Sequence, residues 1–165
     1  MSAAQQIVLI GLSGVGKSTV GRLLADRLNW TFIDTDDIVS ENEGQTPAQL
    51  IVDQGERAFR EIESAVVAEA SKRTPAVIAI GGGAFMDGAN RRALGERALI
   101  CYLDATPPEI AHRIRASAGG VERPMLGEDL ETRLYELDGE RRPFYNHADV
   151  WIPAQAPVAE GEAPG

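Results

Sequence analysis

Eight residues near the start of the chain have the types and spacing needed to hold phosphate groups. Residues 11–18 read Gly-Leu-Ser-Gly-Val-Gly-Lys-Ser and match the pattern G-x-x-x-x-G-K-[ST] in full. Glycines let the backbone wrap tightly, so that several N–H groups point inward at phosphate oxygens. The lysine reaches the outer phosphates of a nucleoside triphosphate, and the serine hydroxyl is a ligand for Mg2+. The pattern predicts a P-loop whose ATP-binding residues are Gly14, Val15, Gly16, Lys17, Ser18 and Thr19. A glycine-rich turn without a ligand is the plainer alternative.

Two further segments place small or acidic residues where strands are expected to end. Asp34-Thr35-Asp36 follows an apolar segment at 31–33, and Gly81-Gly82-Gly83 follows another at 76–80. Ligands of open α/β sheets bind beyond the carboxyl ends of the strands. The two carboxylates could therefore serve a metal ion and an acceptor hydroxyl, and the glycines could admit a ligand close to the backbone. Taken alone, an N-cap explains the acids and a plain turn explains the glycines.

Apolar segments alternate with helical ones along the whole chain. We expect strands at 7–10, 31–33, 76–80, 99–103 and 150–152. Helices are expected at 17–29, 47–54, 56–73, 88–96, 107–116 and 128–147, the last broken near Pro143. In the first helix the apolar side is expected to comprise Val20, Leu23, Leu24 and Leu28. The alternation predicts an α/β fold with a parallel sheet.

Composition narrows the classes of function. Sixteen Lys and Arg residues against 25 Asp and Glu residues give a net charge of -9, which argues against broad binding to nucleic acid or an anionic membrane. One cysteine excludes an internal disulfide framework. No apolar run approaches the ~18 residues of a membrane span, and the N-terminus lacks the regions of a signal peptide. We expect a soluble cytoplasmic protein.

Taken together, these segments resemble the shikimate kinase family. The resemblance rests on residues 11–19, Phe-Ile-Asp-Thr-Asp (32–36), Phe-Arg-Glu-Ile-Glu (59–63), Gly-Gly-Gly (81–83), Arg-Pro-Met-Leu (123–126) and Arg-Arg-Pro-Phe-Tyr (141–145). They occur in the family's order and spacing and cover residues 7 to about 152. Met125 departs from the leucine that is common there, a swap that packing tolerates.

The resemblance implies a fold and an activity. The fold is the three-layer P-loop kinase fold, with strand order 2-3-1-4-5 and helices on both faces. A single domain would span 1–152 with a mobile lid at about 117–127, and a disordered acidic, proline-rich tail would follow at 153–165. The activity is Mg2+-dependent transfer of the ATP γ-phosphoryl group to the 3-hydroxyl of shikimate, in chorismate and aromatic amino-acid biosynthesis. The enzyme would act as a cytoplasmic monomer.

The resemblance also assigns roles by motif position. Lys17, Asp36 and Arg123 would be catalytic, with Arg123 closing onto ATP from the lid. Ser18 and, through water, Asp34 would hold Mg2+. Shikimate would be bound by Asp36, Arg60, Gly82 and Arg141. Arg141 is chosen over Arg142 because it fits the spacing Arg-x-Pro-x-Tyr. Arg115, or alternatively Arg113, would lie at the adenine.

Two other functions stay open from the sequence. A gluconate kinase-like enzyme would share the P-loop and the size, although the segments at 59–63 and 81–83 favour shikimate. A nucleotide-binding regulatory module without transfer activity would have no need to keep Lys17, Asp36 and Arg123 together.

Overall fold

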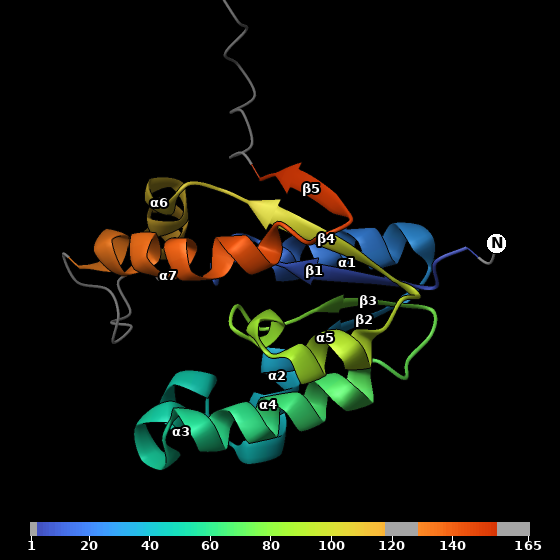
Figure 1. The fold of residues 1–165 in the computed structure, drawn as a ribbon, viewed down its shortest axis with the longest axis horizontal. Helices are drawn as coiled ribbons and strands as arrows, with labels where there is room; N and C mark the ends of the chain where they lie inside the picture. The colour runs from blue at the N-terminus through green and yellow to red at the C-terminus, as the bar shows by residue number, and fades with distance from the viewer. Residues whose placement is uncertain (1–2, 118–128, 155–165) are drawn as a thin grey trace, which may run out of the picture.

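The computed structural model of the chain describes residues 3–117 and 129–154 and contains one parallel sheet (Figure 1). Its strands are β1 (Gln6–Ile10), β2 (Thr31–Asp34), β3 (Ala76–Ala79), β4 (Ala98–Asp104) and β5 (Val150–Pro153). The strand order is β2-β3-β1-β4-β5, and every neighbouring pair is parallel. The predicted fold class and strand order are therefore confirmed.

Helices cover both faces of this sheet. They are α1 (Lys17–Leu28), α2 (Thr35–Glu43), α3 (Pro47–Gln54), α4 (Glu56–Ala70), α5 (Gly88–Leu94), α6 (Pro107–Ser117) and α7 (Leu130–Tyr145), with a 3-10 turn η1 (Ala84–Met86). Alternate residues of β1 enter separate cores: Val8 and Ile10 pack with the α4–α7 side, whereas Leu9 packs with α1. Figure 1 shows α2, α3 and α4 grouped beside β2 and β3. The result is the predicted three-layer arrangement.

Helix α1 packs through its small residues, contrary to the sequence prediction. Gly21 and Ala25 are its buried residues, whereas Val20, Leu23 and Leu28 are 37%, 59% and 39% exposed. A Cβ on Gly21 would lie 2.5 Å from the Phe32 ring, so only glycine permits this approach of helix to sheet. The predicted apolar side was therefore wrong for these three residues.

The last helix continues through its proline. Helix α7 runs from Leu130 to Tyr145 with Pro143 inside it, so the predicted break was wrong. Proline lacks the N–H that an inner helical residue donates. Here it lies in the final turn, and the amide of Asn146, three residues later, still donates to the carbonyl of Arg142 at 2.9 Å.

Two predicted segments fall largely outside the described residues. The lid at 117–127 has only Ser117 within them, and the tail at 153–165 has only Pro153 and Ala154. Among the described residues, no helix has the length and apolar character to cross a membrane.

Candidate active site

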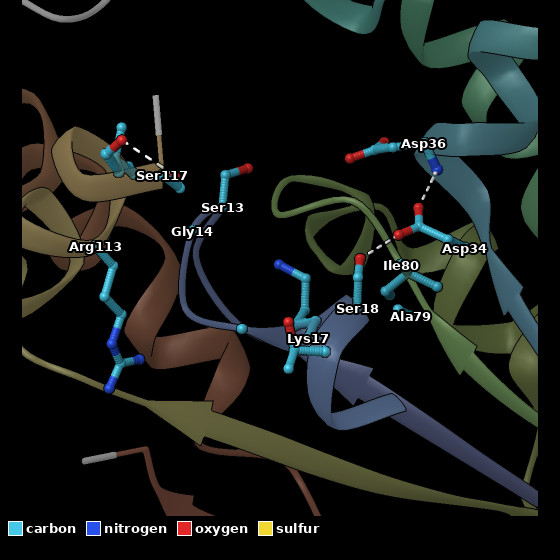
Figure 2. A pocket seen from close by; sticks show the side chains of 13 residues that line it. Ser13, Gly14, Lys17, Ser18, Asp34, Asp36, Ala79, Ile80, Arg113 and Ser117 are labelled. Atoms are coloured by element: carbon cyan, nitrogen blue, oxygen red, sulfur yellow. Dashed lines mark hydrogen bonds between the residues drawn. The ribbon is translucent and has the colours of Figure 1, made fainter. Parts of the chain in front are cut away.

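A pocket of about 490 Å3 opens where the strands of the sheet end (Figure 2). The P-loop forms one wall, and the end of β2 with the start of α2 forms another. Helix α6 closes a third side with Arg113, Ile114 and Ser117. All the predicted ATP-binding residues of the P-loop except Val15, which is buried in the core, therefore line one space with Asp34 and Asp36.

The backbone of the P-loop takes conformations that favour glycine. Gly14 and Gly16 have φ values of 89° and 105°, in the left-handed region that side chains rarely adopt. A Cβ on Gly14 would also lie 2.6 Å from the Ile114 side chain. Gly16 is the N-cap of α1, so the helix begins at the loop and presents its N-terminal amides to the pocket.

The Lys17 side chain lies within the loop. Its Nζ donates to the carbonyls of Gly11 at 2.6 Å and Leu12 at 3.2 Å. Burial lowers the pKa of Lys17 to about 8, an effect that the negative charges of Asp36 and Asp34 partly oppose. The ammonium group is thus a positive charge held by two carbonyls of the loop at the pocket, where it can offset the charge of a phosphate.

Asp34 connects β2, α2 and the P-loop. One carboxylate oxygen accepts from the amides of Asp36 at 3.0 Å and Asp37 at 3.2 Å, so Asp34 is the N-cap of α2. The other oxygen accepts a hydrogen bond from the Ser18 hydroxyl, drawn as a dashed line in Figure 2. The N-cap bonds therefore use one oxygen and leave the other beside the P-loop. The sequence offered this N-cap as the plainer alternative for the acids, but helix α2 was not among the expected helices.

This pair offers oxygen ligands of the kind that Mg2+ prefers. Mg2+ usually keeps several waters and takes one or two protein oxygens together with substrate phosphates. Ser18 and Asp34 supply one hydroxyl and one carboxylate beside the P-loop. Among residues 3–117 and 129–154, no group of three or more His, Cys, Asp or Glu side chains could hold a metal. The donor set fits a nucleotide-bound Mg2+ ion.

Asp36 faces Lys17 across the pocket. It belongs to the first turn of α2, and its side chain points toward the pocket in Figure 2. Burial raises the pKa of Asp36, while the Lys17 charge opposes that rise. A Cβ on Gly81 would lie 2.8 Å from an Asp36 carboxylate oxygen, so Asp36 also lies against the glycine triplet.

The triplet at 81–83 lies between two arginines from distant helices. A Cβ on Gly82 would lie 2.8 Å from Nη1 of Arg141, and one on Gly83 would lie 2.7 Å from Nη1 of Arg60. Larger residues at either position would displace a guanidinium group. The structure therefore brings Asp36, Arg60, Gly82 and Arg141 together around the end of β3.

Comparison with known proteins gives the family of the chain. The profile described as shikimate kinase matches residues 13–160. The chain belongs to the shikimate kinase family. It is 46% identical over 143 residues to a shikimate kinase of Symbiobacterium thermophilum, covering 86% of this chain and 82% of that protein. It is 41% identical to one of Zymomonas mobilis, covering 90% and 85%. As a family member, the chain is a kinase that uses ATP as co-substrate.

The fold of the chain is also similar to solved structures of shikimate kinases. The Acinetobacter baumannii shikimate kinase in complex with shikimate has a TM-score of 0.83 and 31% identity, over 92% of this chain and 84% of that one. A gluconokinase from Sinorhizobium meliloti has a TM-score of 0.60 at 19% identity, over 96% and 88%. That distant likeness shows a shared fold alone and does not favour the gluconate alternative.

Arg141 and Arg142 are adjacent in the chain but have different surroundings. Arg142 makes paired hydrogen bonds to Asp104 at 2.9 and 3.2 Å and to Asp138 at 3.0 and 3.1 Å. Only Arg141 of the two adjoins the glycine triplet. The structure therefore separates an arginine engaged at the β4 end from one that faces the triplet.

The arginines considered for the adenine also differ. Arg113 lines the pocket and donates to the Val15 carbonyl at 2.9 Å. Arg115 lies outside the pocket lining and is 3.8 Å from Glu131. Arg123, predicted to be catalytic, lies outside the described residues.

Glu63 is a site residue to which the sequence prediction gave no role. It is 1% exposed, and it accepts from Nη1 of Arg60 at 2.7 Å. Burial raises its pKa, whereas the Arg60 guanidinium lowers it. The signal available in the sequence was the i, i+3 spacing of Arg60 and Glu63 on one helix.

Proposed function

We propose that this chain transfers the γ-phosphoryl group of ATP to the 3-hydroxyl of shikimate, giving shikimate 3-phosphate and ADP. The observation that carries the proposal is that Lys17 and Asp36 line one pocket in a member of the shikimate kinase family. A phosphate-binding cation and a hydroxyl-binding carboxylate on opposite walls are what transfer between the two substrates needs. The product would enter the route to chorismate and the aromatic amino acids.

On the nucleotide side, the amides of residues 14–19 bind the phosphates and Lys17 offsets their charge. Ser18 would hold Mg2+ directly, and Asp34 would hold it through water. When bound, Mg2+ neutralises charge that develops on the transferring group. Arg113 and Arg115 are the two candidates beside the adenine, and Arg113 has the support of its position in the pocket lining.

On the acceptor side, Arg60 and Arg141 bind the shikimate carboxylate. A guanidinium group suits a carboxylate because its donors form a planar fork. The position of both arginines against the triplet supports this assignment, because the anion then lies beside Gly82, whose backbone contacts the substrate. The Glu63 carboxylate holds the Arg60 fork in place.

Asp36 orients the attacking hydroxyl and accepts its proton. Phosphoryl transfer passes through a loose transition state, so orientation contributes more than early deprotonation. The raised pKa of Asp36 supports a role in proton transfer, because a general base works best when its pKa is closer to neutral pH. Arg123, from a lid at about 117–127, would add positive charge and help to exclude water.

We also propose a single domain at 1–152 followed by a tail at 153–165, acting as a monomer in the cytoplasm on small molecules. The net charge of -9 supports small anions held in a local pocket over nucleic acid as ligands.

A coupled ADP-release assay tests this function. The purified chain is given MgATP with shikimate, with gluconate, and with neither. We expect rapid ADP release in the assay that contains MgATP and shikimate, and not in the other two. Release with gluconate would support the gluconate kinase alternative, and ATP binding without product would support a regulatory module. Lys17→Ala should abolish turnover while the circular dichroism spectrum stays unchanged.

A further inference from the structure

The backbone groups of the glycine triplet can be accounted for one by one. The Gly81 amide donates to Oγ1 of Thr35 at 3.2 Å, and the Gly82 carbonyl accepts from the Tyr145 hydroxyl. The carbonyls of Gly81 and Gly83 accept from amides of η1 at 3.0 and 3.2 Å. Within the part of the chain that the structure describes, the Gly82 and Gly83 amides have no hydrogen-bond acceptor. Two donors of the triplet are therefore left for a ligand.

The two side-chain hydroxyls come from opposite sides of the site. Thr35 and Tyr145 are both fully buried, at 0% exposed. Thr35 is the first residue of α2 and directly precedes Asp36, whereas Tyr145 ends α7, one turn after Arg141. Each hydroxyl therefore joins the triplet to an element that carries a proposed shikimate-binding side chain.

The surroundings of Tyr145 keep its hydroxyl a donor. Its ring packs against Tyr102 with centroids 5.0 Å apart, and this packing holds the ring in one place. Burial raises the pKa of Tyr145 to about 12, so the hydroxyl keeps its proton at neutral pH. The Tyr102 hydroxyl bonds elsewhere, to Asp104 at 3.1 Å.

We propose that the hydroxyls of Thr35 and Tyr145 are positioning groups for the acceptor, which fix the triplet relative to Asp36 and Arg141. This inference rests on the proposed function. Without these bonds the triplet would lose its two side-chain anchors, and the amides of Gly82 and Gly83 would no longer be held where shikimate needs them. Neither Thr35 nor Tyr145 is among the residues that line the pocket at the P-loop, so the effect should fall on the acceptor alone.

The test removes each hydroxyl but keeps the aromatic ring of Tyr145 and the β-branched shape of Thr35. Tyr145→Phe and Thr35→Val should each raise KM for shikimate by about threefold to tenfold, the range expected for one lost buried hydrogen bond. KM for ATP, and kcat at saturating shikimate, should stay within about twofold of wild type. Two matched controls, Tyr102→Phe and Thr35→Ser, should keep the wild-type KM for shikimate.

Steady-state kinetics separates positioning from stability. A merely structural role would reduce the active fraction and hence kcat, with KM unchanged, and that result would overturn the proposal. Equal rises in both KM values would overturn it as well. Should Tyr145→Phe fail to fold, the comparison of Thr35→Val with Thr35→Ser decides. Wild-type enzyme without shikimate-dependent ADP release would defeat the proposed function itself, whereas active wild type with unchanged variants would defeat only the positioning role.

Discussion

Raising the pH through about 8 should weaken the capture of ATP, because the buried Lys17 ammonium loses its proton there. An ordinary lysine has a pKa of 10.5, and burial lowers that of Lys17 to about 8. The protonated form binds phosphate, so activity is present below the pKa and lost above it. Since kcat/KM for ATP reports the enzyme before ATP binds, its value at pH 9 should be about one tenth of the plateau.

The assay is kcat/KM for ATP between pH 7 and 9.5 at saturating shikimate and Mg2+. Lys17→Arg is the matched control, because a guanidinium group stays charged throughout this range. Its profile should lie lower and lack the fall near pH 8. A wild-type profile that stays level to pH 9.5 would refute the reasoning from burial. An identical fall in Lys17→Arg would assign the titration to another group.

Four substitutions test the assigned roles. Asp36→Asn should lower kcat by about a hundredfold or more with KM for ATP nearly unchanged, and equal changes in both constants would point to a structural role. Arg60→Ala should raise KM for shikimate about tenfold to a hundredfold, because it removes a charged hydrogen bond; a defect confined to ATP would contradict that assignment. Arg113→Ala should raise KM for ATP by about threefold or more and Arg115→Ala by less, and the reverse order in steady-state kinetics would place the adenine beside Arg115.

Local sequence patterns were sufficient for the P-loop and for most elements. The glycines and Lys17 act through the backbone of one short segment, so their chemistry can be predicted from neighbouring residues. The alternation of apolar and helical segments likewise predicted the parallel sheet. Strand order came from the family resemblance, because a short apolar strand does not specify its neighbours.

Contacts between distant segments account for what was missed. The buried side of α1 depends on Gly21 meeting Phe32, which no helical periodicity reveals. Thr35 and Tyr145 bond to triplet residues 46 and 63 positions away along the chain. Their hydroxyls become informative only after the fold has placed them there.

Asp34 of the acidic cluster has two separate sets of partners. Asp34 was open to interpretation as an N-cap or as part of a metal site. Its two carboxylate oxygens have separate partners, the first amides of α2 and the Ser18 hydroxyl. The N-cap interpretation is therefore confirmed, and the metal role stays a prediction.

Identification of the reaction product tests the central claim most directly. The wild-type chain is incubated with MgATP and shikimate, and the products are quantified by mass spectrometry and phosphorus NMR. We expect ADP and a shikimate monophosphate ester at the 3-hydroxyl in equal amounts. ADP accompanied by inorganic phosphate, with shikimate unchanged, would contradict a pocket that joins the two substrates.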